Sequence, residues 1–358
     1  MEIKYAILDI DVINLQQCFH SHFGSLLASS ALKNTKCLDT HTPNMTPLRR
    51  HIRSAEECLT LSKTDSNSSN VIFVDGSWYL PNIPDRNARK EYEAGPRIEE
   101  AKFFDVDDIA STGPVLNPKG LPHMMPPAAL FAAAMDKMGI RNCDTIIVYA
   151  GKGCFAAPRT WFTFLSLGHD PSRVFIMDGG LDDWDRLGGP VDRNPVKSIF
   201  ASELNVEEAR YVAREPANIV DMAYVQNVLN ESSASRLVVD ARSSGRFVGT
   251  EPEPRPGLRG GHMAGSQNLF FLCFHDPMNP LRFKSIHAMK NILVDNGLSQ
   301  NKNLKEVIST CGTGVTACSL VLALYECNDS DSNHLEIKVY DGSWTEWGDP
   351  NSNTIVVK

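Results

Sequence analysis

The residues best suited to chemistry lie between Ser309 and Cys318, which read Ser-Thr-Cys-Gly-Thr-Gly-Val-Thr-Ala-Cys. Cys311 ends an apolar strand pattern, two glycines follow it closely, and an apolar helical pattern begins directly afterwards. Gly312 and Gly314 allow the chain to curl so that successive backbone N–H groups point at one place. The N-terminus of the helix adds partial positive charge there, which favours a thiolate over a thiol. The pattern therefore predicts that Cys311 is a nucleophile whose anion is stabilised by the backbone.

The competing interpretation of this loop is structural: a small residue fills a tight turn between strand and helix. Two glycines are an odd choice for packing alone, so we favour the nucleophile. Cys318 lies two helical turns further on and is expected in the core. The chain holds nine cysteines and no Cys-x-x-Cys pair, which fits neither a disulfide framework nor a zinc site. We expect most of them to be reduced and buried.

The elements that position this loop are expected to occur twice. Three strand patterns recur at offsets between 161 and 165 residues, which indicates a duplicated domain. The pairs are Val71–Asp75 with Leu237–Asp240, Thr145–Tyr149 with Glu306–Thr310, and Val174–Asp178 with Ile337–Asp341.

Short apolar strands alternate with helical patterns such as Ala128–Met138 and Thr316–Tyr325. This alternation predicts an α/β fold of two tandem domains, each a mostly parallel sheet with helices on both faces. We predict the first domain over residues 71–187, a linker over 188–204 and the second domain over 205–358. In such folds ligands bind at the carboxyl ends of the strands, so chemistry is expected after Tyr149 or after Thr310.

Residues 1–70 are expected to be a poorly ordered or targeting extension, because residues 62–70 read SKTDSNSSN and no periodicity is sustained. A short helix over His51–Leu61 is the alternative, since Ala55, Cys58 and Leu59 would share one face. The stretch from Met45, MTPLRRHIRS, is close to a presequence in composition, which leaves a mitochondrial or a cytoplasmic location open.

Composition excludes other classes of partner. The net charge of −8 argues against a nucleic acid or an anionic membrane held by bulk charge. No apolar run approaches the roughly 20 residues that a membrane-spanning helix needs.

The repeated strands, the loop at Cys311 and the motif Tyr340–Trp347 together resemble the tandem rhodanese-fold sulfurtransferases, over about residues 71–350. Members of that family that use thiosulfate carry Arg and Lys directly after the cysteine, whereas those that use mercaptopyruvate carry Gly and Ser or Thr. Gly312 and Thr313 are uncharged. The resemblance therefore implies that 3-mercaptopyruvate donates sulfur to Cys311 as a persulfide and that pyruvate is released. It also implies a thiol acceptor such as thioredoxin, or cyanide, and no metal or organic cofactor.

The same resemblance assigns the site residues. It implies that Arg246 and Arg255 grip the substrate carboxylate, a task that suits the planar guanidinium, and that Asp107 and His123 face the cysteine and relay protons with Thr313. The other substrate-binding positions that it implies lie in the loop, at Gly312, Gly314, Val315 and Thr316.

Each of these residues also has a purely structural interpretation. Arg255 sits in a proline-rich acidic run and would otherwise pair with Glu251 or Glu253. Arg242 is expected to be a structural partner of the sheet end, and His262 to order its own loop. Asp107 would otherwise cap a helix.

The first copy is predicted to be catalytically silent, because Ala150 stands where Cys311 stands in the second copy. Cys154, four positions later, is not a suitable replacement. Three alternative functions remain: a sulfurtransferase that prefers thiosulfate, a phosphatase, and a non-catalytic binding module. The phosphatase is disfavoured because Cys-x5-Arg chemistry requires an arginine where Ala317 stands.

Overall fold

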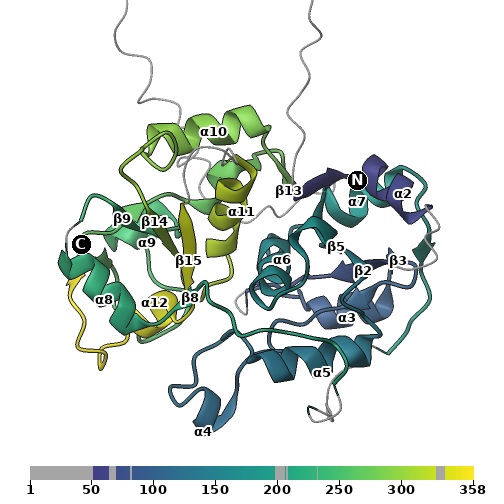
Figure 1. Ribbon diagram of the computed structural model, residues 1–358, viewed down its shortest axis with the longest axis horizontal. Coiled ribbons are helices and arrows are strands. Elements are labelled where there is room, and N and C mark those ends of the chain that lie inside the picture. Colours follow the sequence, from purple (N-terminus) through teal and green to yellow (C-terminus); the bar gives the residue numbers. More distant parts are fainter. Residues whose placement is uncertain are drawn as a thin grey trace, which may run out of the picture. The chain divides into compact units, whose positions relative to one another are not determined.

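Two five-stranded parallel sheets with the same strand order form the framework (Figure 1). The first sheet has the order β1 (Ile52–Ser54), β6 (Val174–Asp178), β5 (Thr145–Tyr149), β2 (Val71–Asp75) and β4 (Lys102–Phe103). The second has the order β8 (Ile219–Val220), β15 (Glu336–Tyr340), β14 (Glu306–Thr310), β9 (Arg236–Asp240) and β11 (Gln267–Asn268). The predicted duplication and the α/β fold are confirmed.

These elements come from a computed structural model that describes residues 51–63, 70–80, 83–197, 206, 209–231, 233–327 and 335–358, which belong to one compact unit. No helix among these residues is long and apolar enough to cross a membrane.

Equivalent backbone hydrogen bonds fix the correspondence between the two copies. The N–H of Leu181 donates to the carbonyl of Ala150 at 3.1 Å, and the N–H of Trp344 donates to the carbonyl of Cys311 at 3.0 Å. Ala150 and Cys311 therefore occupy the same place in the two domains, as the sequence alignment predicts.

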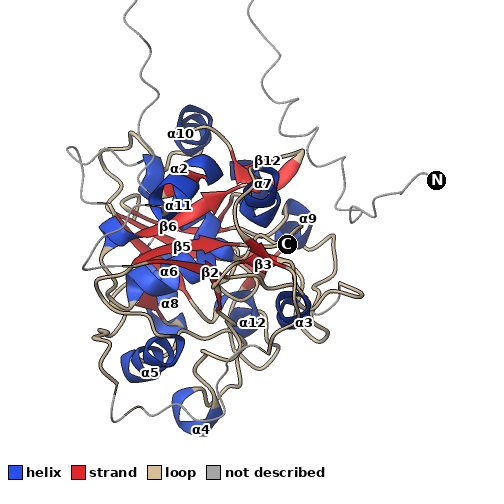
Figure 2. Cartoon of the chain, turned by 90° about the vertical axis from the view of Figure 1, so that its right-hand side faces the viewer, coloured by secondary structure: helices blue, strands red, loops and turns tan. Residues whose placement is uncertain are grey.

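Helices cover both faces of each sheet (Figure 2). In the first domain α5 (Ala128–Met138) and α6 (Ala157–Ser166) lie on one face, and α2 (Ala55–Ser62), α3 (Ala88–Ala94) and α7 (Gly180–Arg186) pack on the other. In the second domain α10 (Ile286–Asp295) and α11 (Ala317–Cys327) share one face, and α8 (Met222–Glu231) and α12 (Ser343–Trp347) the other. Coverage of both faces explains why the central strands are continuously apolar.

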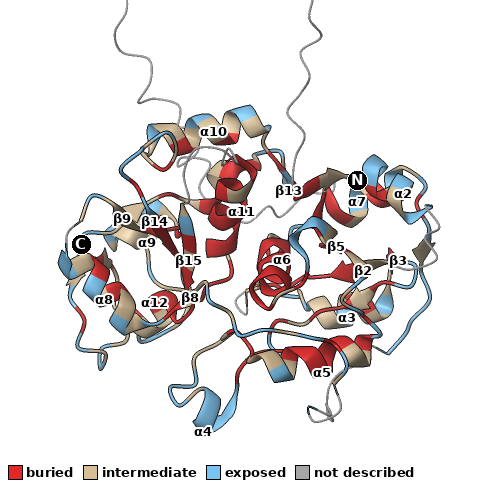
Figure 3. Cartoon of the chain, in the orientation of Figure 1, coloured by how far each residue is buried: buried red, intermediate tan, exposed pale blue. Residues whose placement is uncertain are grey.

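One hydrophobic cluster is continuous across both domains, because α6 and α11 pack against each other. Every residue of α6 is buried, and so is almost every residue of α11 (Figure 3). A helix that is buried all round belongs in a core, so the interface between the domains is part of the protein interior.

A hairpin of the second domain reaches the first. Its strands are β12 (His275–Asp276) and β13 (Asn279–Phe283), and it follows the short helix η2 (Phe271–Phe274). The carbonyl of Leu281 accepts the N–H of Gly179 at 3.0 Å, and the carboxylate of Asp178 accepts the N–H of Phe283 at 2.8 Å. The hairpin thus covers the carboxyl end of β6. Other short elements are α4 (Gly113–Leu116), η1 (Pro171–Arg173), β10 (His262–Met263) and β16 (Val356–Val357).

The predicted start of the first domain at residue 71 is wrong. Strand β1 pairs in parallel with β6, with Ile52 opposite Ile176, and is the counterpart of β8 in the second sheet. The alternative of a short helix is confirmed in part, since α2 buries Ala55 and Cys58. Ser54 and Glu57 form a capping box at its N-terminus, a sequence signal that fixes the start of a helix. Residues 1–50 and 64–69 of the expected extension lie outside the described residues.

The predicted linker, residues 188–204, is also misplaced at both ends. Strand β7 (Val191–Asp192) pairs with β3 (Arg97–Ile98) and belongs to the first domain. Beyond the linker, the N–H of Tyr211 donates to Asp136 at 3.0 Å and that of Arg214 to the carbonyl of Leu167 at 3.0 Å. The chain therefore still runs along the first domain after residue 205. Residues 198–205 lie outside the part that the structure describes.

Candidate active site

Cys311 lies where β14 ends, and α11 begins at Ala317, as the sequence predicts. Its side chain is buried, with 1% of the residue exposed. In the loop that follows, Thr313, Gly314 and Val315 are buried as well, whereas Gly312 and Thr316 are half-buried. The burial of Cys311 suits a nucleophile that must exclude competing water.

Helix α12 holds the loop carbonyls. Besides the bond from Trp344 to the carbonyl of Cys311, the carbonyl of Gly312 accepts the N–H of Thr345 at 2.9 Å and its hydroxyl at 2.8 Å. In a planar trans peptide the C=O and the N–H point in opposite directions. The N–H groups of Gly312 and Thr313 therefore point away from α12. Anchoring of the carbonyls by α12 is thus what turns these N–H groups in the direction that an anion-binding loop requires.

Local geometry explains why glycine occupies positions 312 and 314. Gly314 has a φ of +78°, which glycine adopts without cost. A Cβ atom at Gly312 would stand 3.1 Å from Nη2 of Arg246. The first glycine therefore makes room for an arginine, and the second allows the turn.

Ser343 anchors the start of the loop. Its Oγ donates to the carbonyl of Tyr340 at 2.8 Å and accepts the N–H of Cys311 at 3.3 Å. Ser343 and Thr345 belong to the motif Tyr340–Trp347, but the sequence analysis did not predict that both hold the loop. A duplicated motif at the end of a neighbouring strand was the available signal.

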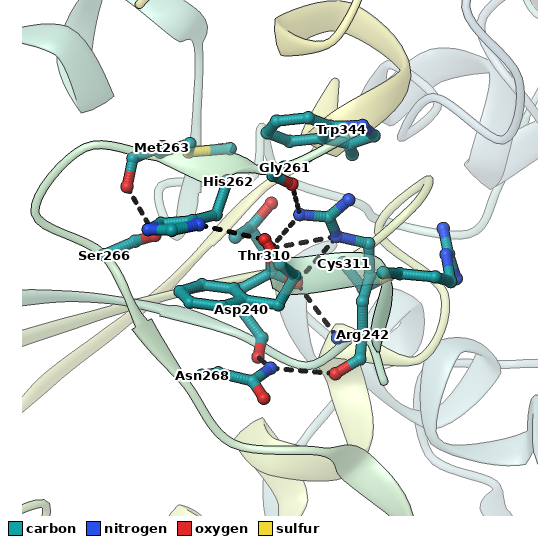
Figure 4. Close-up of polar contacts among 12 residues, drawn as sticks. Asp240, Arg242, Gly261, His262, Met263, Ser266, Asn268, Thr310, Cys311 and Trp344 are labelled. Carbon is teal, nitrogen blue, oxygen red and sulfur yellow. Dashed lines mark hydrogen bonds and ion pairs between the residues drawn. The ribbon is translucent and has the colours of Figure 1, made fainter. Parts of the chain in front are cut away.

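Arg246 lies beside the loop on α9 (Ser244–Val248) and pairs with Glu253 at 2.6 Å. Glu253 also pairs with Arg242 at 2.8 Å. Arg242 is fully buried against Asp240 and the carbonyl of Gly261, under the ring of Trp344 (Figure 4). The structural role predicted for Arg242 agrees with these contacts.

Arg255 reaches the first domain. Its Nη2 lies 3.3 Å from Nε2 of His123, and neither Glu251 nor Glu253, both within the described chain, lies at ion-pair distance from it. Burial lowers the pKa of Arg255, repulsion from Arg246 adds to this, and the thiol of Cys311 acts against it. The acidic-run alternative is therefore wrong for Arg255: the carboxylate of Glu253 pairs with Arg242 and Arg246.

Asp107 and His123 form a close pair, with Oδ1 and Nδ1 2.5 Å apart. The indole N–H of Trp78 donates to the other carboxylate oxygen at 3.0 Å. Burial opposes the charged form of Asp107, but its hydrogen bonds to His123 and Trp78 and the nearby charges hold its pKa below the usual range. Asp107 is therefore an ionised partner that can orient the imidazole.

The remaining predicted loop residues lie as follows. Thr313 is buried, but its hydroxyl makes no hydrogen bond to Asp107 or His123 within the described residues. The carbonyls of Val315 and Thr316 accept the N–H groups of Cys318 at 3.2 Å and Ser319 at 3.1 Å, which begins α11. The structure thus brings the four predicted site residues from outside the loop, Arg246, Arg255, Asp107 and His123, to one place beside it, but leaves the hydroxyl relay without a direct bond.

His262 has the local role expected for it. Its Nδ1 lies 2.9 Å from the carbonyl of Phe247, and its ring stacks on that of Phe247. It orders the start of its own loop rather than reaching the cysteine.

In the first copy, Cys154 is buried and its Sγ accepts the N–H groups of Trp78 at 3.3 Å and Ala156 at 3.4 Å. Burial raises its pKa to about 11. Within the described chain, no cluster of three or more His, Cys, Asp or Glu side chains could hold a metal ion.

Similarity to known proteins agrees with this geometry. The family model "Rhodanese-like domain" matches residues 221–349, which is most of the second copy. The 3-mercaptopyruvate sulfurtransferase of Mus musculus is 34% identical over 84% of this chain and 92% of its own length. The thiosulfate sulfurtransferase of Cricetulus griseus is 36% identical over 76% of this chain and 84% of its own length.

Among solved structures, the Tum1 protein of Saccharomyces cerevisiae superposes with a TM-score of 0.69 and 28% identity, over 83% of this chain and 94% of its own. The duplicated sheets, the cysteine loop and these likenesses lead to one conclusion. The chain belongs to the rhodanese-like sulfurtransferases.

Proposed function

We propose that the protein transfers sulfur from 3-mercaptopyruvate to a thiol acceptor through a persulfide on Cys311. The observation that carries this proposal is the composition of the site. The loop itself contributes no cation, and two arginines, Arg246 and Arg255, stand beside it. A donor whose negative charge is a carboxylate remote from its sulfur fits this division better than thiosulfate, in which the charge lies on the transferred outer sulfur and on the sulfonate group bonded directly to it.

In the first half-reaction the thiolate of Cys311 attacks the thiol sulfur of the donor. A sulfur–sulfur bond forms, the carbon–sulfur bond breaks, and its electron pair leaves with the pyruvate enolate. The thiol proton of the donor passes to the enolate carbon, which gives pyruvate and an anionic persulfide. His123, held by Asp107, is the candidate for moving this proton, and Thr313 is the candidate hydroxyl between them.

The loop amides stabilise the anionic persulfide. Because α12 holds the carbonyls of Cys311 and Gly312, the neighbouring N–H groups are fixed before the reaction, so no reorganisation is needed when the negative charge moves onto the outer sulfur. In the second half-reaction the acceptor sulfur attacks the outer sulfur of the persulfide. A new sulfur–sulfur bond forms, the bond to Cys311 breaks, and its electron pair stays on Cys311 as the thiolate. The proton of the acceptor thiol ends on the transferred sulfur, so the acceptor leaves as a persulfide.

The test is the ratio of kcat/KM for 3-mercaptopyruvate and thiosulfate, with thioredoxin, a small thiol and cyanide as acceptors. We expect 3-mercaptopyruvate to be preferred, and intact mass after donor alone to show one added sulfur atom that is absent in Cys311→Ser. A preference for thiosulfate would replace this donor assignment by the alternative that the Cricetulus griseus relative represents. Absence of the added sulfur with both donors would overturn the persulfide itself.

A further inference from the structure

The first domain contributes a buried cation to the underside of the cysteine loop. Arg159 lies on α6 and Asp341 follows β15, and they are 1% and 2% exposed. Nη1 of Arg159 lies 2.8 Å from Oδ1 of Asp341. The pair therefore crosses from one domain to the other inside the protein.

The same guanidinium holds two backbone carbonyls. Nη1 donates to the carbonyl of Gly314 at 3.2 Å, and Nη2 donates to the carbonyl of His123 at 2.7 Å. The second oxygen of Asp341 accepts the N–H of Met125. Two segments that supply the candidate site, the loop after Cys311 and the turn at His123, are thus fastened to one ion pair.

The turn at His123 depends on such fastening. His123 has a φ of +61°, a left-handed conformation that is unfavourable for a residue other than glycine. Surrounding contacts must hold a residue in this conformation, and Arg159 supplies one directly at its carbonyl. The position of the His123 imidazole beside Asp107 and Arg255 follows from this turn.

The bond to Gly314 also sets the direction of the next amide. Sγ of Cys318 lies 3.3 Å from the same carbonyl oxygen, on which Arg159 converges as well. Because the peptide is planar, the N–H of Val315 points away from both donors. Arg159 thus does for the end of the loop what α12 does for its beginning.

We propose that Arg159 is a positioning residue for sulfur transfer: it fixes the amide after Gly314 and the turn at His123 so that both face the Cys311 sulfur. This inference rests on the proposed function and assigns the first domain a part in it beyond Asp107 and His123.

The electrostatic setting supports the proposal. Burial works against the charged form of Arg159, but the Asp341 carboxylate and the thiols of Cys318 and Cys311 raise its pKa above the ordinary value. The guanidinium is therefore held in its charged form under the loop. The other charged groups around the loop are Arg246 with Glu253, Arg255, and the Asp107–His123 pair.

A matched control exists in the same domain. Arg97 is 3% exposed, pairs with Asp192, and donates to the carbonyls of Tyr92 at 3.1 Å and Asn194 at 2.9 Å. It has the same kind of partners as Arg159 but none in the loop. A loss that follows only from disturbing a buried arginine would appear in both variants.

The variants are Arg159→Met with Asp341→Leu, Arg159→Lys, and the control Arg97→Met with Asp192→Leu. The double changes avoid leaving one buried charge without its partner. Folding is checked by circular dichroism and thermal melting. The readouts are the rate of iodoacetamide alkylation at Cys311 against pH, followed on its own peptide, and the single-turnover rate of persulfide formation.

We expect the Arg159 double variant to slow persulfide formation by at least about tenfold and to move the pH midpoint of alkylation upward, because the loop amides no longer converge on the sulfur. KM for the donor should change much less, because Arg246 and Arg255 remain. Arg159→Lys should restore part of the shift in midpoint but little of the rate, since an ammonium cannot hold two carbonyls in a fixed fork. The Arg97 control should match wild type in both readouts.

The proposal is overturned if the folded Arg159 double variant keeps the wild-type midpoint and rate, or if the control loses as much. Because alkylation needs no donor, this result is independent of which donor the enzyme prefers. If wild type forms no persulfide while the alkylation midpoint still shifts, the proposed function fails but the positioning of the thiol stands.

Discussion

The two copies of the fold differ most in what covers the end of their central strand. In the first copy the hairpin β12–β13 packs over Ala150, and the cavity that remains between Ala150, Leu281 and Phe283 has a volume of about 10 Å³. In the second copy the corresponding cover is the segment of the first domain from Asp107 to Met125, which brings polar side chains. The docking bond is the same in both: the strand-end carboxylates of Asp178 and Asp341 each accept a backbone N–H from the other domain.

This comparison teaches how one duplicated unit serves two purposes. Each domain covers the other, but the hairpin presents apolar side chains and the segment 107–125 presents Asp107 and His123. Loss of the cysteine in the first copy therefore coincides with an apolar cover, whereas retention in the second coincides with a polar one. The first domain contributes side chains to the site that it faces.

The strongest way to break the comparison is to move the nucleophile. The variant Cys311→Ser with Ala150→Cys places a thiol at the equivalent position of the first copy. We expect turnover to fall at least about a thousandfold, as for removal of a nucleophile, because the hairpin leaves no room for a donor there. The measurement is pyruvate release together with intact mass, with Cys311→Ser alone as the control. Recovery of turnover above this control would show that the hairpin does not prevent catalysis in the first copy and that only the missing cysteine does.

The two arginines beside the loop allow a finer comparison. Arg246 shares Glu253 with Arg242, whereas Arg255 lies next to His123 without a carboxylate at ion-pair distance in the described chain. We expect Arg255→Gln to raise KM for 3-mercaptopyruvate by about 10- to 100-fold, since a hydrogen bond to a charged group contributes roughly 1.5–3 kcal/mol. Arg246→Gln should have the smaller effect.

The control for these changes is Arg282→Gln. Arg282 lies on the hairpin strand β13, and the change removes its solvent-accessible ion pair with Asp183 of α7. Its KM should equal that of wild type. Equal KM values for all three variants would show that the donor carboxylate binds elsewhere.

The smallest effects are expected at the two other cysteines of the paired loops. Cys154→Ser and Cys318→Ser should each keep turnover within about twofold of wild type, because a hydroxyl can make the same hydrogen bonds as the thiol that it replaces. Cys318→Ser is expected to be the more disturbing, since its Sγ shares the Gly314 carbonyl with Arg159. Steady-state turnover and thermal melting measure both. A folded Cys154→Ser protein without turnover would contradict the silence of the first copy.

Much of the fold was predictable because strands buried on both faces carry a local signal. The bounds of β2, β5, β6 and β14 agree with the sequence patterns. The edge strand β1 was missed because it has three residues and only its first is fully buried, so its sequence carries no continuous apolar run. Its place is set by pairing with β6, a contact that only the tertiary structure provides.

The candidate site divides in the same way. Cys311 and its glycines lie within one short loop, so spacing alone indicated them. The arginines, Asp107 and His123 were identified only by resemblance, since they are distant in sequence from the loop. Arg159 was missed, although a charged residue inside an otherwise apolar helix was a signal that it needed a buried partner.

The order of the chain gives the loop one further property. The carbonyls of Cys311 and Gly312 are held by Trp344 and Thr345, and Asp341 is the partner of Arg159. During synthesis the ribosome releases Cys311 before any of these residues. The loop after Cys311 can therefore take its final shape only after the segment up to Thr345 has emerged and docked, by which time the whole first domain has already been synthesised.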